Sequence, residues 1–240
     1  MSCAGYTMED YDETYRDFRI EVPEYYNFGF EVIDRHGLAD RNRLAMIWVT
    51  EEEKEKTFTF RQMMNLSNSA ANMLLKYGVK KGDRVIIMLP RVPEWWVFAI
   101  ACIKLGAVFC PCPTMLTAKD LRYRINAAKI RMVVTDAENA PKLEEICCDC
   151  PTLAGRLVID AHLPGWVSYI EETTYPAPVS RSLVKVAGME KTKSTDPMVI
   201  YFTSGTTGEP KMVLHNHALP LGHVTTGAFW LDLRENDLHF

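Results

Sequence analysis

The segment from Thr203 to Lys211 gathers four hydroxyl side chains, two glycines, a proline and a lysine into nine consecutive positions. It directly follows an apolar stretch, Met198 to Phe202, that is typical of a buried strand. Glycines let a ligand approach backbone N–H groups, hydroxyls donate hydrogen bonds, and a lysine supplies a mobile positive charge. A polyphosphate needs all three, so the segment predicts a phosphate-binding loop. The predicted contact residues are Thr203, Ser204, Gly205, Thr206, Thr207, Gly208, Glu209, Pro210 and Lys211.

Two other interpretations of this loop are weaker. The phosphate loop of P-loop NTPases needs a glycine, four residues, then Gly-Lys and a serine or threonine. Here Gly205 is followed by Thr-Thr-Gly-Glu-Pro-Lys-Met, so the spacing fails and Met212 stands where a hydroxyl is required. An ordinary surface turn would need neither the spaced glycines nor the Pro-Lys exit after an apolar strand.

Other residues with chemical potential are better explained by packing or turn formation. Three histidines follow the loop, but no cysteine or carboxylate stands at ligand spacing, so no metal site is predicted. Three clustered cysteines are expected to pack at a helix end. Two tryptophans that follow a proline are expected to serve core and surface packing instead of ligand binding. Two carboxylates are assigned to turns and helix caps. These residues are His215, His217, His223, Cys147, Cys148, Cys150, Trp95, Trp96, Asp83 and Glu94.

The elements that must position the loop alternate between strands and helices. Apolar strands separated by helical segments predict an α/β fold, with a parallel sheet covered by helices on both faces. Strands are expected at 84–89, 107–112, 132–135, 157–160 and 198–202, and helices at 61–77, 93–105, 118–128 and 140–147.

The segments around this alternation are less regular. Residues 1–30 are rich in aromatic and acidic side chains and predict an arm packed on a domain surface. A helix is expected at 31–41, a strand at 44–49, a turn at 51–56 and a strand at 57–60 that continues the sheet. The stretch 173–197 is interpreted as a surface connection. A last helix is expected at 217–230, just after a strand end near His215.

Composition excludes several classes of protein. The 240 residues are 48% hydrophobic and 24% charged, with a formal net charge of −4, which does not suit a nucleic-acid binder. The longest apolar run is broken by Lys104 and Pro111, so no transmembrane segment is predicted. The N-terminus is acidic, unlike a secretory or mitochondrial leader, and seven cysteines show no framework spacing. We therefore expect a cytoplasmic protein with reduced thiols.

The loop sequence Thr-Ser-Gly-Thr-Thr-Gly-Glu-Pro-Lys resembles the phosphate-loop signature of the adenylate-forming superfamily. Further segments are similar to the medium-chain branch of its AMP-forming acyl-CoA synthetases, so the resemblance covers nearly the whole chain. Those segments are Val22–Phe28, Lys81–Val85, Leu89–Trp96, Leu105–Val108, Tyr123–Ile125 and Phe229–Leu233. The fold that the resemblance implies is the incomplete N-terminal domain of this superfamily, spanning residues 1–240.

The resemblance implies a two-step ligase. A fatty or related carboxylate attacks the α-phosphorus of ATP to give acyl-AMP and pyrophosphate, and coenzyme A then displaces AMP to give the thioester. Preorganised donors around the β- and γ-phosphates would stabilise the charge on the departing pyrophosphate, with Mg²⁺ bridging the phosphates. No catalytic residue is identifiable, because the family's adenylation lysine and C-terminal domain would lie beyond Phe240.

We accordingly expect a partial enzyme that is inactive alone and that a C-terminal polypeptide complements. An apolar patch should be exposed around the last helix. Two alternatives stay open at this stage. The chain is either another adenylate-forming enzyme, passing its acyl group to a carrier protein or to oxygen chemistry, or a non-catalytic fragment that binds a nucleotide or an acyl group.

Overall fold

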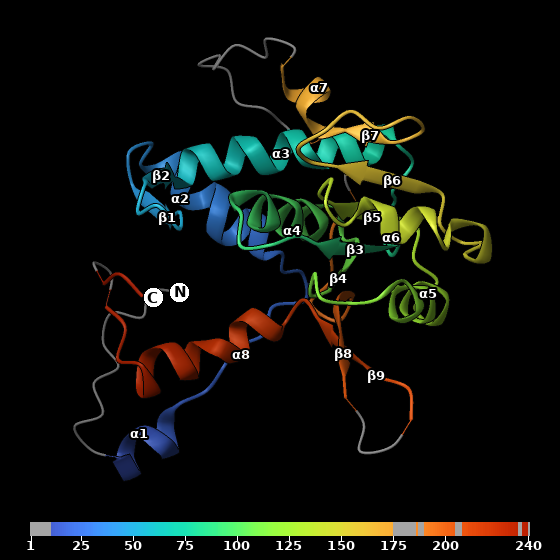
Figure 1. The fold of residues 1–240 in the computed structure, drawn as a ribbon. Helices are drawn as coiled ribbons and strands as arrows, with labels where there is room; N and C mark the ends of the chain where they lie inside the picture. The colour runs from blue at the N-terminus through green and yellow to red at the C-terminus, as the bar shows by residue number, and fades with distance from the viewer. Residues whose placement is uncertain (1–10, 175–185, 187–189, 205–207, 235–236, 240) are drawn as a thin grey trace.

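A computed structural model of the protein describes residues 11–174, 186, 190–204, 208–234 and 237–239. Its main sheet has seven strands in the order β7-β6-β5-β3-β4-β8-β9 (Figure 1). All neighbouring strands are parallel except the last pair, β8 and β9, which is antiparallel. The predicted α/β class is therefore confirmed. The strands are β3 (Arg84–Met88), β4 (Val108–Pro111), β5 (Met132–Thr135), β6 (Gly155–Val158), β7 (Val167–Ser168), β8 (Pro197–Thr203) and β9 (Lys211–Asn216).

Alternation along the central strand β3 creates two cores, one on each face of the sheet. Val85 and Ile87 belong to the core that includes residues of α3 (Phe60–Lys76) and α4 (Pro93–Leu105). Ile86 and Met88 belong to the core that includes residues of α5 (Ala118–Ala127). Because helices cover both faces, these four side chains have no exposed surface.

Local sequence signals explain where the central helices begin and end. In α3, Thr59 forms a capping box with Gln62, and the following Gly78 adopts a left-handed φ of 84°. In α4, Pro93 occupies the first turn and Gly106 ends the helix with a φ of 66°. The predicted bounds of α4 are confirmed in full.

Several predicted elements differ from the structure. The strands β1 (Leu44–Val49) and β2 (Glu55–Thr59) form a separate antiparallel two-stranded sheet instead of extending the main sheet. The helix predicted at 31–41 is a π-helix, η1 (Gly29–Asp34), continued by α2 (Arg35–Ala39). The helix predicted at 140–147 is shorter, because α6 (Ala140–Glu144) is separated from the 3₁₀ turn η2 (Cys147–Asp149). The strand predicted at 157–160 starts and ends two residues earlier, as β6.

The end of the chain forms a helical arm beside the sheet. The predicted last helix is divided between α8 (Leu219–Thr225) and the π-helix η3 (Thr226–Trp230). It lies alongside α1 (Tyr11–Asp17), away from the main body of the molecule (Figure 1). Phe229 of η3 meets Phe18, which follows α1, in an edge-to-face contact with ring centroids 5.1 Å apart.

The stretch interpreted as a surface connection is only partly superficial. It was predicted from residue 173, but α7 (Tyr169–Thr174) crosses that boundary. Further along, Thr192 and Ser194 are buried and bind the N-terminal segment. The amide of Tyr26 donates to the Thr192 carbonyl at 3.2 Å, and the Ser194 amide donates to the Glu24 carbonyl at 2.9 Å. Residues 23–27 therefore form a strap against 192–194, which sequence periodicity did not reveal.

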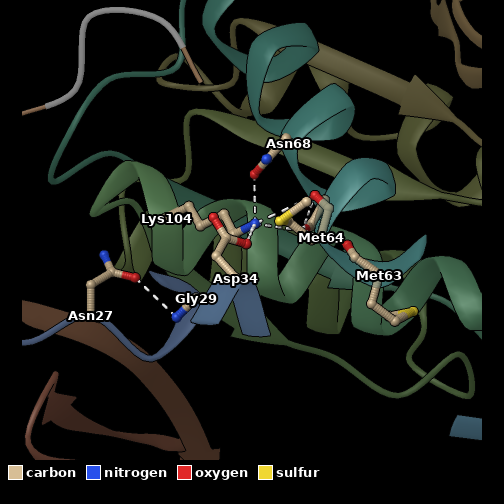
Figure 2. Close-up of polar contacts among 8 residues, drawn as sticks. Asn27, Gly29, Asp34, Met63, Met64, Asn68 and Lys104 are labelled. Carbon is tan, nitrogen blue, oxygen red and sulfur yellow. Dashed lines mark hydrogen bonds and ion pairs between the residues drawn. The ribbon is translucent and has the colours of Figure 1, made fainter. Parts of the chain in front are cut away.

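A buried charge stabilises the junction of η1, α3 and α4. The fully buried ammonium of Lys104 donates to Asp34 Oδ1 at 2.6 Å, Asn68 Oδ1 at 2.5 Å and Ser67 Oγ at 2.9 Å (Figure 2). Burial lowers the pKa of Lys104, and the Asp34 carboxylate opposes that shift. Because its donors are matched by acceptors, the lysine can remain inside the protein.

Candidate functional site

The predicted phosphate loop connects two strands of a hairpin. Thr203 at the end of β8 is paired with Lys211 at the start of β9, so Ser204–Pro210 form the connection. Since β8 runs parallel to β4, the loop lies at the carboxyl edge of the parallel strands. Ligands of open α/β sheets bind outside this edge. The predicted strand before the loop is thereby confirmed, and β9 gives the loop a second anchor whose extent the sequence did not indicate.

The described loop residues are available to a ligand. Thr203, Ser204, Glu209 and Lys211 are exposed, and Pro210 is half-buried. Thr203 Oγ1 lies 3.5 Å from the Lys211 carbonyl, a long hydrogen bond across the base of the hairpin. Gly205, Thr206 and Thr207 lie outside the described residues, so their predicted role stays a prediction.

Gly208 has a conformational reason to be glycine. Its φ of 91° is in the left-handed region that side chains disfavour. In the part of the chain that the structure describes, no heavy atom beyond its chain neighbours lies within 4 Å of a Cβ atom built at this position. The glycine is therefore set by backbone conformation, and the open space beside it is compatible with a ligand approaching the backbone.

Helix α5 contacts both ends of the loop. The Tyr123 hydroxyl donates to the Pro210 carbonyl at 3.0 Å, and the Arg124 guanidinium lies 4.8 Å from the centre of the Phe202 ring. Burial raises the pKa of the Cys112 thiol to about 11, and the neighbouring Arg124 opposes that rise. Sequence reasoning assigned no role to this Tyr-Arg pair, although it lies in a segment that resembles the acyl-CoA synthetases.

The three histidines near the loop lie in different surroundings. Among the residues that the structure describes, no three His, Cys, Asp or Glu side chains are grouped to hold an ion. His215 contacts the Tyr201 ring, and His223 is exposed on α8. His217 is fully buried, and burial lowers its pKa to about 4.

The remaining candidate residues occupy core, surface and turn positions. Cys150 is buried in the core that includes residues of α5, whereas Cys148 is exposed. Trp95 packs against the core that includes residues of α3 and α4. Trp96 contacts the Trp95 ring and is 55% exposed. Asp83 accepts the Lys80 amide at 2.8 Å, which confirms a turn role. Glu94 lies in the first turn of α4. The N-cap residue of this helix is Val92, and no side-chain hydrogen bond caps the helix.

Residues 33–237 match the AMP-binding enzyme family, and the chain belongs to that family. It is 37% identical over 243 residues to a protein named acyl-coenzyme A synthetase ACSM4, mitochondrial, of Rattus norvegicus, covering 98% of this chain and 40% of that protein. Acyl-coenzyme A synthetase ACSM3, mitochondrial, of the same species is 38% identical over 237 residues, covering 95% of this chain and 40% of the relative. The chain thus spans about two fifths of these relatives.

Solved structures give the same fold. The anthranilate CoA ligase AuaEII, in complex with anthranoyl-AMP, superposes with a TM-score of 0.75 at 27% identity, covering 90% of this chain and 39% of that one. An acyl-CoA synthetase of Brucella canis reaches a TM-score of 0.82 at 23% identity, covering 96% and 42% of the two chains. The family match and the curated relatives confirm the resemblance to acyl-CoA synthetases that the sequence indicated. No helix in the described ranges is long and apolar enough to cross a membrane.

Proposed function

We propose that this chain supplies the triphosphate-binding part of an AMP-forming acyl-CoA synthetase. The observation that carries the proposal is the hydroxyl- and glycine-rich loop, anchored between β8 and β9 at the carboxyl edge of the sheet. Exposed Thr203, Ser204 and Lys211 combine neutral donors with a cation where the parallel strands end. Family membership and the names of the relatives support the same reaction class.

In the proposed reaction the loop acts on the leaving group. A carboxylate oxygen bonds to the α-phosphorus of ATP while the bond to the bridging oxygen breaks, and negative charge moves onto pyrophosphate. Fixed donors on the loop stabilise that charge without having to reorganise. Lys211 contributes a full positive charge, which makes it the strongest single contact we assign.

The substrates follow from the relatives and remain proposals. We assign ATP, coenzyme A and a medium-chain or related carboxylate to the complete enzyme, with Mg²⁺ held mainly by phosphate oxygens. The described loop residues fit that arrangement, since exposed Thr203, Ser204 and Lys211 provide donors to phosphate oxygens. A cytoplasmic location also stays a prediction, because the relatives carry mitochondrial names.

Calorimetric titration of the 240-residue chain with inorganic tripolyphosphate and with ATP tests the loop assignment. Both should bind weakly, and Lys211→Ala should reduce affinity about tenfold or more, because a charged hydrogen bond is lost. Thr206→Ala should give a smaller reduction. Lys80→Ala is the matched control, because Lys80 is exposed and precedes the amino-terminal end of β3, whereas the loop lies at the carboxyl ends of the parallel strands. Equal affinities for the Lys211 and Lys80 variants would overturn the assignment.

The alternative is a non-catalytic nucleotide-binding chain. Carboxylate-dependent pyrophosphate exchange separates the two possibilities. We expect no exchange by the chain alone, and recovered exchange after addition of a polypeptide covering the rest of a relative's length. Exchange that stays absent after complementation, despite intact tripolyphosphate binding, would favour the alternative.

A further inference from the structure

The proposed reaction assigns no role to the Tyr123–Arg124 pair on α5, although both residues contact the ends of the loop. Tyr123 and Arg124 are both half-buried, and each contacts a different end of the same hairpin connection. Tyr123 binds the carbonyl of Pro210, the last loop residue before β9. Arg124 stacks on Phe202, one residue before the strand ends at Thr203.

We propose that Tyr123 and Arg124 are positioning residues that brace the exit and the entry of the phosphate loop against α5. This inference rests on the proposed function of the loop and adds residues outside the loop to its working parts. Neither side chain needs to touch the phosphates. The brace determines how Thr203 and Lys211, at the ends of β8 and β9, are held relative to α5.

The exit contact has a specific geometric consequence. Proline fixes its own φ and has no N–H group, so the Pro210 carbonyl is the one backbone hydrogen-bonding group of this residue. Tyr123 occupies that acceptor from the neighbouring helix, and the next residue, Lys211, pairs with Thr203. The hydrogen bond therefore restrains the backbone immediately before the cation that we assign to the phosphates.

The entry contact uses a planar cation on an aromatic face. Phe202 packs against the same core as α5, and Arg124 lies over its ring. Such an interaction favours one ring orientation. Both contacts originate from consecutive residues of one helix, and α5 is itself anchored by a capping box between Thr117 and Asp120. A well-anchored helix can transmit its position to both ends of the loop.

The exit test is Tyr123→Phe, which removes only the hydroxyl. The matched control is Tyr201→Phe, on β8 near the loop, whose ring is 41% exposed. Hydrogen–deuterium exchange of peptides spanning residues 202–213 should accelerate about fivefold in the Tyr123 variant, the size expected for one neutral hydrogen bond. The melting temperature should stay within about 1 °C, since local opening is affected more than global unfolding. Tripolyphosphate affinity should fall about threefold to fivefold.

The entry test is Arg124→Met, which keeps the length of the side chain and removes its plane and charge. Arg122→Met, on the exposed side of α5 and paired with Asp149, is its control. Faster exchange confined to the loop peptides, with lower tripolyphosphate affinity, supports the brace. Exchange unchanged in both variants, or accelerated equally across all peptides, overturns it.

These outcomes are distinct from failure of the proposed function. If the unsubstituted chain binds no tripolyphosphate, the phosphate assignment fails, while the exchange comparison still decides whether the brace exists.

Discussion

The central strands β3–β5 and the β8–β9 hairpin belong to one sheet but are stabilised in opposite ways. On β3, Val85 to Met88 are completely buried, because helices cover both faces. On β9, Met212, Val213 and Leu214 are 47%, 38% and 57% exposed. The outer strand β9 depends on its antiparallel pairing with β8, and the hairpin projects beyond the rest of the sheet (Figure 1). The central strands are thus the scaffold, and the hairpin presents the candidate site.

The largest expected effect lies in the scaffold. Asp34→Ala leaves the buried Lys104 ammonium without its counter-ion, and we expect unfolding free energy to fall by about 3 kcal/mol or more in urea titrations. The control Asp149→Ala breaks an exposed pair with Arg122 and should cost below about 1 kcal/mol. Combining Asp34→Leu with Lys104→Met should recover most of the loss. Similar costs for the Asp34 and Asp149 single variants would contradict the scaffold's dependence on buried polar groups.

The next effect lies where the hairpin rejoins the core. Burial lowers the pKa of His217 to about 4 from an ordinary 6.5, while Asp196 opposes the shift and Lys81 adds to it. The unfolded chain therefore takes up the proton first as pH falls. Stability from this group is complete above about pH 6.5 and is lost progressively towards pH 4, by roughly 2–3 kcal/mol.

Urea titrations between pH 4 and 7.5 check this expectation. His217→Gln should flatten the pH dependence relative to the unsubstituted chain, and the exposed His223→Gln should not. Identical slopes for all three proteins would show that His217 is protonated equally well in both states.

A smaller effect is expected within the loop. Gly208→Ala forces a side chain into a left-handed φ and should lower unfolding free energy by about 1–2 kcal/mol in thermal or urea unfolding. Gly222→Ala provides the control, because it places a methyl group in open space on α8 and should leave stability equal or raise it by about 0.5 kcal/mol. A neutral Gly208 variant would mean that the loop readily adopts another conformation.

The smallest stability effect is expected on the exposed face of β9. Leu214→Ser should change unfolding free energy by less than about 0.5 kcal/mol, but it should reduce concentration-dependent self-association in sedimentation velocity runs. Met115→Ser, which alters an 87% exposed side chain outside the hairpin, should leave association unchanged. If the Leu214 variant self-associates as strongly as the unsubstituted chain, the exposed face of β9 is not a self-association surface.

The accuracy of the sequence predictions follows the same division. In the scaffold, Pro93, Gly78 and Gly106 are local signals that act through their own backbone, so α3 and α4 were placed to within about a residue. The turn between β1 and β2 was expected, but the two strands were assigned to the main sheet, because alternation alone does not specify whether a local hairpin also pairs with more distant strands.

The candidate site shows the same limit. The chemistry of Thr203 to Lys211 was evident from residue types, since phosphate binding needs particular groups in a short segment. The brace from Tyr123 was not, because it joins positions 87 residues apart through a single hydrogen bond. The buried state of His217 was equally hidden, since its burial depends on the segments around Asp196 and Lys81.

The strap formed by residues 23–27 has a consequence for synthesis on the ribosome. Asn27 donates to the Ile103 carbonyl and to Thr192 Oγ1, a partner 165 positions later. At about 5–20 residues per second, the N-terminal segment waits roughly 8–33 s after its own emergence before Thr192 is made. During that interval residues 23–27 lack their native partners at 192–194, so the aromatic side chains of this segment are open to chaperone capture or misassociation.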